Sequence, residues 1–267
     1  MIDELSVVVH DGQGPPLLLV HGMLASRAQW LLNLPAFSTF ATPVTVELWG
    51  HHLSPSPSDP DAYKPATYSR IFETIRRNLG VDEWFVGGCS LGAALTMRYS
   101  LEYPNRVLGQ FLTNSSSAFA DEDTCRTWRE SSSGSYARII QGGMKAVNRI
   151  AVHPRHAKRL PEEVKQALLV DAESHSVEGI AATMRWTSPF ASVRANLAQL
   201  KVPSMLLCGS FERRFRPLRA YAKTAMPSLV VHDLPAGHAV NMEAADTFNV
   251  LVDTFVSRLA PRSAHVS

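Results

Sequence analysis

The fold is decided by residues 86–94, which read Val-Gly-Gly-Cys-Ser-Leu-Gly-Ala-Ala. This stretch contains the pattern Gly88-x-Ser90-x-Gly92, with a short apolar run before it and an amphipathic helix candidate, 91–103, after it. A chain that turns sharply from a strand into a helix holds the residue at the turn in a strained conformation, and the residues two positions away must be small. The sequence therefore predicts a strand, a tight turn at Ser90 and a helix.

The predicted turn also indicates chemistry. A serine in this place carries its hydroxyl into open space at the start of a helix. The first N–H groups of a helix have no partner inside it, so the N–H of Leu91 is free to bind a developing oxyanion. Ser90 is thus a candidate nucleophile, although a serine between glycines can also be a plain turn residue.

Length and composition are those of an ordinary globular protein. The chain has 267 residues, of which 45% are hydrophobic and 19% charged. This length allows one large α/β domain with an insertion, or two small domains. A formal net charge of +2 gives no reason to expect a nucleic-acid partner.

The cysteines, the first residues and the length of the apolar runs indicate a cellular compartment. Three widely spaced cysteines, Cys89, Cys125 and Cys208, argue against a disulfide framework or a zinc site and fit a reducing compartment. The first residues lack the basic and apolar regions of a signal peptide, and no apolar run approaches the roughly 18 residues that a membrane span needs. We expect a cytoplasmic protein with no membrane partner, and the sequence leaves its oligomeric state open.

Apolar runs of strand length alternate with helical patterns along most of the chain. The strand candidates are 5–9, 17–20, 44–48, 84–86, 107–112, 203–208 and 228–234. The helix candidates are 29–37, 68–79, 91–103, 193–200, 218–225 and 239–259. This alternation predicts an α/β fold with a parallel sheet and helices on both faces. The last residues, 260–267, are expected to form a loose tail.

Residues 115–189 interrupt the alternation. They contain no buried-strand pattern and read as helices, with breaks expected at the serine-rich stretch 131–135 and at Gly142-Gly143. We interpret this segment as a helical cap inserted into a core that residues 1–114 and 190–267 form.

A serine nucleophile needs a base and an acid that orients the base. His238 follows the last strand candidate and precedes the last helix, and Glu212 follows the strand candidate 203–208. Parallel sheets place their sites at the carboxyl ends of strands, so both loops should reach Ser90. The N–H of Met23, in the loop after an early strand, is our candidate for the second oxyanion donor.

The choice of acid is open to two alternatives. Glu212 lies beside Arg213, Arg214 and Arg216 and could simply form ion pairs with them. Asp233 is the nearest rival acid, but it falls on the last strand candidate and not in a loop.

Five motifs fall in the order found in α/β-hydrolase-fold proteins, and the chain resembles that family over essentially its whole length. They are His21-Gly22, Gly50-His51, Gly88-x-Ser90-x-Gly92, Gly209-x-x-Glu212 and Gly237-His238. The resemblance implies an α/β-hydrolase fold, with a mostly parallel central sheet, helices on both faces and a helical cap. Two departures stand out: the family commonly has Asp at the acid position, and His52 replaces the second glycine of a Gly-His-Gly loop.

Within the family, the chain resembles small carboxylesterases, carbon–carbon hydrolases and the menaquinone-pathway synthases, which eliminate pyruvate instead of hydrolysing. The stretches 211–215 and 21–26 are similar to those synthases. The synthases usually carry an arginine soon after the nucleophile turn, where this chain has Ala93-Ala94.

Substrate contacts are expected mainly from the cap. Trp128 and Arg129 are predicted to face the pocket, and His21 and His52 are further candidates, although His21 could instead pack against the oxyanion loop. The basic stretch 149–159 could recognise a substrate carboxylate or phosphate, or could be a solvated helix face.

These residues together predict a serine hydrolase that cleaves an ester, thioester or activated carbon–carbon bond of a small acyl compound. Ser90 would attack, His238 would move the proton, Glu212 would orient the imidazole, and the N–H groups of Met23 and Leu91 would bind the oxyanion. No metal or organic cofactor is expected. The alternatives are a cofactor-free lyase or synthase of the same fold and a non-catalytic ligand receptor.

Overall fold

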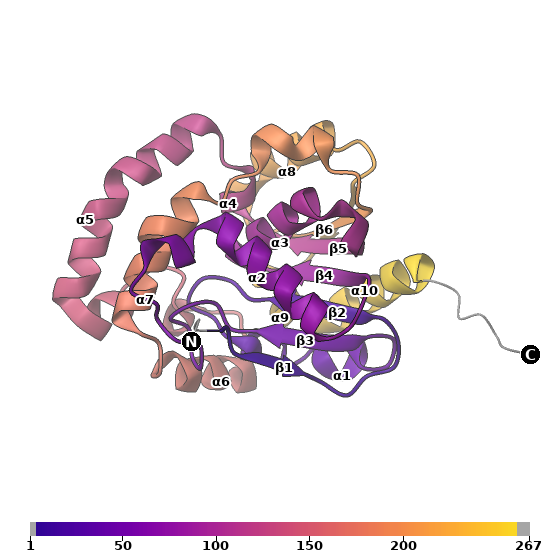
Figure 1. Ribbon diagram of the computed structural model, residues 1–267, viewed down its shortest axis with the longest axis horizontal. Helices are drawn as coiled ribbons and strands as arrows, with labels where there is room; N and C mark the ends of the chain where they lie inside the picture. The colour runs from indigo at the N-terminus through magenta and orange to yellow at the C-terminus, as the bar shows by residue number, and fades with distance from the viewer. Residues whose placement is uncertain (1–3, 261–267) are drawn as a thin grey trace, which may run out of the picture.

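A seven-stranded sheet runs through the computed structural model, which describes residues 4–260 (Figure 1). The strands lie in the order β1-β3-β2-β4-β5-β6-β7, and β1 is antiparallel to β3 whereas the other neighbours are parallel. Their bounds are β1 (Val7–Val9), β2 (Pro16–Val20), β3 (Thr42–Val46), β4 (Trp84–Gly88), β5 (Val107–Thr113), β6 (Ser204–Gly209) and β7 (Val230–Leu234). Each strand candidate is confirmed, and so is the mostly parallel sheet.

Strand register brings the candidate site together. Val20 pairs with Gly88, Gly88 with Leu112, and Gly209 with Leu234, so these strands end at the same edge of the sheet. The loops that follow them therefore meet at this edge, which is where sites form in parallel sheets.

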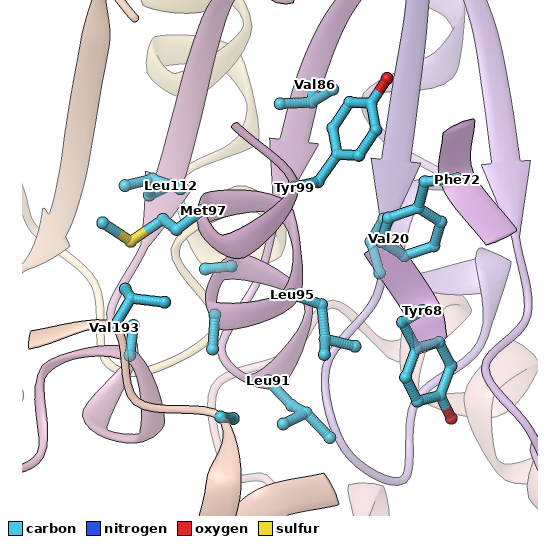
Figure 2. Packing of buried hydrophobic residues seen from close by; sticks show 14 of the residues in the cluster. Val20, Tyr68, Phe72, Val86, Leu91, Leu95, Met97, Tyr99, Leu112 and Val193 are labelled. Carbon is cyan, nitrogen blue, oxygen red and sulfur yellow. The ribbon is translucent and has the colours of Figure 1, made fainter. Parts of the chain in front are cut away.

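Helices cover both faces of the sheet. On one face, α3 (Leu91–Glu102) packs between the sheet and α2 (Pro65–Asn78), and most of its residues are buried. Figure 2 shows this packing, in which Leu95 and Tyr99 of α3 lie among residues of the sheet and of α2. On the other face, α1 (Leu34–Phe37) and α10 (Ala245–Leu259) enclose a second apolar cluster. Burial on both faces explains why the central strands are continuously apolar.

Three predicted helices of the core differ in detail. The candidate 29–37 is a 3-10 turn, Arg27–Trp30, followed by α1. The candidate 193–200 is a 3-10 helix, Arg194–Gln199. The candidate 218–225 corresponds to α8 (Arg216–Ala225). The candidate 239–259 is divided into α9 (Val240–Glu243) and α10, because Ala244 has non-helical backbone angles. The expected tail falls almost wholly outside the described residues.

The segment between β5 and β6 is helical. It contains α4 (Ser116–Phe119), α5 (Glu122–Val147), α6 (Glu162–Ala172) and α7 (Val177–Ala182), followed by a π-helical turn, Thr183–Thr187. We call residues 115–189 the cap; Figure 1 shows α5 and α7 beyond one end of the sheet. No helix within residues 4–260 is both long enough and apolar enough to cross a membrane.

The cap corrects one prediction and confirms another. The expected break at 131–135 is wrong, because α5 continues through these serines. Their hydroxyls bond back to the helix: Ser131 Oγ donates to the carbonyl of Thr127 (2.9 Å) and Ser132 Oγ to that of Arg129 (2.6 Å). The break at the glycine pair is confirmed, since Gly143 has φ 57° and ψ −152°, a conformation that favours glycine.

Candidate active site

Ser90 lies at the turn between β4 and α3 with φ 52° and ψ −113°, which is strained for a residue with a side chain. Its backbone is hydrogen-bonded to Thr113, the last residue of β5, and to Ser115, which follows that strand. Its N–H donates to Thr113 Oγ1 (3.3 Å), and its carbonyl accepts from Ser115 Oγ (2.6 Å). The strained conformation is therefore supported by its surroundings.

The two glycines of the motif are required by close approach. A Cβ on Gly88 would lie 2.6 Å from the Cα of Ala93, and one on Gly92 would overlap the carbonyl oxygen of Val20. Neither neighbour can yield cheaply, because both contacts are with backbone. This confirms the prediction that the residues two positions from Ser90 must be small.

In the loop after β2, the N–H groups on either side of Met23 are hydrogen-bonded. The N–H of Gly22 donates to Gln29 Oε1 (2.8 Å), and the N–H of Leu24 donates to His51 Nε2 (3.1 Å). Between them, the N–H of Met23 forms no hydrogen bond within the described residues, and neither does that of Leu91. Both N–H groups belong to residues that line the same cavity as Ser90.

Gln29 and His51 thus fix the loop that carries Met23. The amide of Gln29 continues into a buried network, in which Gln29 Nε2 donates to Asn241 Oδ1 (3.4 Å) and Asn241 Nδ2 donates to the carbonyl of Gln29 (2.7 Å). Burial with the nearby His21 and His175 holds the pKa of His51 well below its usual value, so His51 is a neutral acceptor. Sequence reasoning missed both positioning residues.

His238 and Glu212 are in direct contact. His238 Nδ1 lies 3.0 Å from each carboxylate oxygen of Glu212. Asn114 Nδ2 donates to Glu212 Oε2, and Asn114 Oδ1 accepts from the N–H of Gly209 (3.1 Å). Burial alone would raise the pKa of Glu212, but the His238 hydrogen bond and charge and the Asn114 hydrogen bond outweigh it and lower that pKa. Sequence reasoning also missed Asn114.

The alternatives for the acid do not fit the geometry. Asp233 forms a two-bond ion pair with Arg219, at 2.8 and 2.6 Å, and within the described chain it does not reach His238. The three arginines beside Glu212 form no ion pair with it within residues 4–260. Glu212 is therefore the carboxylate that the fold presents to His238.

One predicted link is not formed. Ser90 and His238 line the same cavity, but no hydrogen bond between them is present in the part of the chain that the structure describes. In unliganded enzymes such bonds are often long and tighten only when substrate binds.

The cavity over Ser90 has a volume of about 930 Å³ and lies between core and cap. The core side contributes Met23, Ser90, Glu212 and His238. The cap side contributes Trp128, as predicted, with apolar side chains that include Val152, Leu160, Leu168 and Met184.

Three candidates for substrate contact are wrong. His21 is fully buried, and its Nε2 accepts from the N–H of Leu48 (3.0 Å). His52 lies where the core meets the cap, with Nδ1 3.0 Å from Ser174 Oγ. Arg129 turns away and pairs with Glu122. None of the three lines the cavity.

The basic stretch of the cap supplies the cations instead. Lys158 and Arg159 line the cavity, together with Arg214 from the core. Both side chains are also exposed to solvent, so they lie at the open side of the cavity and neither interpretation of 149–159 is contradicted for them.

The cysteines are all buried. Burial raises the pKa of the Cys89 and Cys208 thiols to about 12, and it also raises the pKa of Cys125. Cys89, next to Ser90, is therefore a small buried side chain and not a second nucleophile.

The model of the alpha/beta hydrolase fold family matches residues 15–245. This protein belongs to the alpha/beta hydrolase fold family. A (lyso)-N-acylphosphatidylethanolamine lipase of Bos taurus is 36% identical over 95 residues, which are 34% of this chain and 28% of the lipase. The chain thus spans little more than a quarter of that relative's length.

Other relatives match along most of the chain at lower identity. A 2-succinyl-6-hydroxy-2,4-cyclohexadiene-1-carboxylate synthase of Yersinia pseudotuberculosis is 26% identical over 93% of this chain and 90% of its own length. The crystal structure of the enol-lactonase from Burkholderia xenovorans LB400 superposes with a TM-score of 0.80 at 19% identity, covering 95% of this chain and 96% of that one. The likeness to the lactonase is one of fold.

Proposed function

We propose that this protein is a serine hydrolase of carboxylic esters, with thioesters and activated carbon–carbon bonds as related substrates. The observation that carries the proposal is the contact of His238 with Glu212 in the cavity that Ser90 and the N–H groups of Met23 and Leu91 also line. Nucleophile, base, orienting acid and oxyanion donors are the parts that acyl transfer needs.

In this proposal Ser90 Oγ attacks the carbonyl carbon of the substrate, and its proton passes to His238 Nε2. The oxyanion binds the N–H groups of Met23 and Leu91. As the intermediate collapses, the imidazolium gives its proton to the leaving alcohol or thiol, and an acyl-enzyme remains. Water then attacks through the same base and releases the carboxylic acid.

Glu212 contributes through His238. It accepts a hydrogen bond from Nδ1–H, which leaves Nε2 free to take the proton of Ser90, and its charge stabilises the imidazolium. Asn114 supports the carboxylate from the other side. Glu has one methylene more than the usual Asp, and the distance of 3.0 Å between His238 Nδ1 and Glu212 Oε1 supports this role.

Two alternatives make different predictions. A synthase or lyase would use Ser90 and His238 to abstract a substrate proton. The similarity to a synthase along most of the chain supports this alternative. A receptor would bind its ligand without turnover. Ala93-Ala94, in place of the arginine usual in the synthases, favours the hydrolase.

The test is turnover of p-nitrophenyl esters of graded chain length, with labelling by a fluorophosphonate that reacts with activated serines. Parent protein should hydrolyse the esters and take one label on Ser90. Ser90→Ala should lose the label and at least about 1,000-fold of kcat while keeping the circular dichroism of the parent. A Ser90→Ala variant with a tenth of the parent activity would contradict the proposal.

A further inference from the structure

We propose that the cavity selects acyl substrates that carry an anionic group, a carboxylate or a phosphate, away from the bond that is cleaved. This inference rests on the proposed ester hydrolysis and specifies its substrate class. Three cationic side chains line the cavity: Lys158, Arg159 and Arg214. None of them forms an ion pair within residues 4–260, so each is available to a ligand.

The cations reach the cavity from both of its sides. Arg159 belongs to the cap, and its guanidinium lies 5.2 Å from the ring centroid of Phe211, the residue before Glu212. Arg214 lies on a 3-10 turn, Arg213–Phe215, in the core. The buried ring of Phe215 anchors that turn by packing 6.0 Å from the ring of Phe119. The two arginines therefore come from different sides of the same cavity.

The two carboxylates of the lining already have partners. Glu212 binds His238 and Asn114. Glu243 Oε2 accepts from the N–H of Gly237 at 2.7 Å. Neither carboxylate forms an ion pair with the three cations in the described chain, so the cationic groups keep their hydrogen-bond donors for a ligand.

A buried histidine on the same wall lacks an acceptor. His153 is only 2% exposed and lines the cavity. Its burial, with Arg155 and His156 nearby, lowers its pKa to about 4, so the ring is neutral at pH 7. Its Nδ1 accepts from the N–H of Arg155 (3.2 Å), which places the ring proton on Nε2.

This Nε2–H has no hydrogen-bond partner in the described part of the chain. Buried donors are rarely left unpaired, because losing the bond to water without replacement is costly. The wall that carries the cations thus also holds one unpaired buried donor.

The rest of the wall indicates the shape of the substrate. Guanidinium groups bind carboxylate and phosphate through two parallel hydrogen bonds, and lysine adds a compact charge. The apolar side chains of the cap, Val152, Leu160, Leu168 and Met184, leave room for a hydrocarbon chain between this charge and Ser90. The expected substrate is an acyl chain with an anionic end.

The experiment compares three p-nitrophenyl esters of equal chain length. The hexanoate ends in a methyl group, the adipate monoester ends in a carboxylate, and the 5-phosphonopentanoate ends in a phosphonate. We expect kcat/KM for one or both anionic esters to exceed that for the hexanoate by about tenfold, mainly through KM. The preference should shrink as salt is added, and the stronger anionic arm identifies carboxylate or phosphate as the group recognised.

The variant is Lys158→Gln/Arg159→Gln/Arg214→Gln, and its readout is the ratio of kcat/KM for the anionic ester to that for the hexanoate. This ratio cancels effects common to both esters, and it should fall by about tenfold. The matched control is Arg155→Gln/Arg213→Gln, which removes exposed neighbouring arginines that do not line the cavity, and which should keep the parent ratio. Equal or better turnover of the hexanoate by the parent, or an unchanged ratio in the triple variant, would overturn the proposal.

A binding measurement separates this proposal from the hydrolase itself. Calorimetry on Ser90→Ala compares monomethyl adipate with dimethyl adipate, which lacks the charge. Tighter binding of the charged ester, alongside a parent protein that turns over no ester, would support the anion site and contradict the hydrolase. Turnover by the parent with equal binding of the two esters would contradict the anion site alone.

Discussion

The core side of the cavity is held by backbone contacts, whereas its cap side is held largely by polar side chains. Around Ser90, glycines let backbone segments touch, and the strained turn is hydrogen-bonded on both sides. At the seam with the cap, the N–H of His52 donates to His175 Nδ1 (3.0 Å), and Ser26 Oγ donates to Asp171 Oδ2 (2.6 Å). Two small apolar clusters also join cap and core, one centred on Leu24, Ile139 and Ile180 and the other on Val164, Leu168 and Met242.

The two kinds of construction suit different tasks. Acyl transfer needs its groups placed to within a fraction of an ångström, and packed backbone gives that precision. Substrate choice needs only a wall of suitable shape and charge, which side chains of the cap can supply. We therefore expect core substitutions to affect rate and stability strongly, and cap substitutions to affect selectivity.

The largest effect is expected at the core acid. Glu212→Gln should lower kcat by roughly 1,000- to 10,000-fold, because an amide can hold the wrong imidazole tautomer and cannot stabilise the imidazolium. Asp233→Asn, which breaks only the surface pair with Arg219, should keep kcat near that of the parent. Steady-state kinetics on a p-nitrophenyl ester decide the matter, and the reverse pattern would make Asp233 the acid.

Two glycine-to-alanine changes compare the regions by stability. Gly92→Ala in the core should cost about 3 kcal/mol or more of unfolding free energy, since the new Cβ would overlap the carbonyl oxygen of Val20. Gly134→Ala in α5 meets no atom within 4 Å and should stabilise the protein by about 0.5–1 kcal/mol through helix propensity. Denaturant unfolding measures both, and equal effects would refute the contrast.

The seam should be sensitive to acid. Burial, with His21 nearby, lowers the pKa of His175 to about 4, whereas an unfolded histidine titrates near pH 6.5. Between these values the unfolded chain binds a proton that the folded chain does not, so the free energy of unfolding falls as the pH is lowered from about 6.5. The contribution of neutral His175 is fully present above that range.

His175→Asn tests this directly, because the amide oxygen can still accept from the N–H of His52. The variant should lose up to about 1.4 kcal/mol per pH unit of the parent's slope between pH 6.5 and about 4.5. Denaturant unfolding at several pH values across this window measures the slope for both proteins. If the free energy of unfolding of the variant depends on pH as steeply as that of the parent, His175 does not cause the acid sensitivity.

The smallest effect is expected at Trp128, on the cap wall. Trp128→Ala should change KM or the chain-length preference several-fold, about 1 kcal/mol in kcat/KM, and should leave fluorophosphonate labelling of Ser90 intact. Arg129→Ala is the matched control, because Arg129 pairs with Glu122 away from the cavity. Loss of labelling in folded Trp128→Ala would mean that the cap helps to build the reacting centre.

The sequence is most informative where local geometry decides the structure. Gly88, Ser90 and Gly92 predict the turn, and continuous apolar runs predict the strands, because a buried parallel strand and a tight turn each allow few residue types. The pairing of Glu212 with His238 also follows, from their places at the ends of strands. The fold class is therefore predictable from the amino-acid sequence alone.

Contacts between distant segments are not predictable in the same way. Asn114, Gln29 and His51 are ordinary polar residues in the sequence, and their role appears only once the sheet brings their loops together. The prediction for Arg129 fails because the side of α5 that faces the cavity depends on how the cap packs. The predicted break at 131–135 fails because the bonds of these serines to the preceding turn are invisible in a propensity pattern.

The three buried thiols make the protein a convenient host for site-specific dyes. Because their pKa values are raised, Cys89, Cys125 and Cys208 should not react with maleimides at neutral pH. New cysteines at Ser133 on α5 and Thr74 on α2, both exposed, could then carry a donor and an acceptor without removal of any native cysteine. Energy transfer between the two dyes would report the distance between cap and core in solution, with and without a substrate.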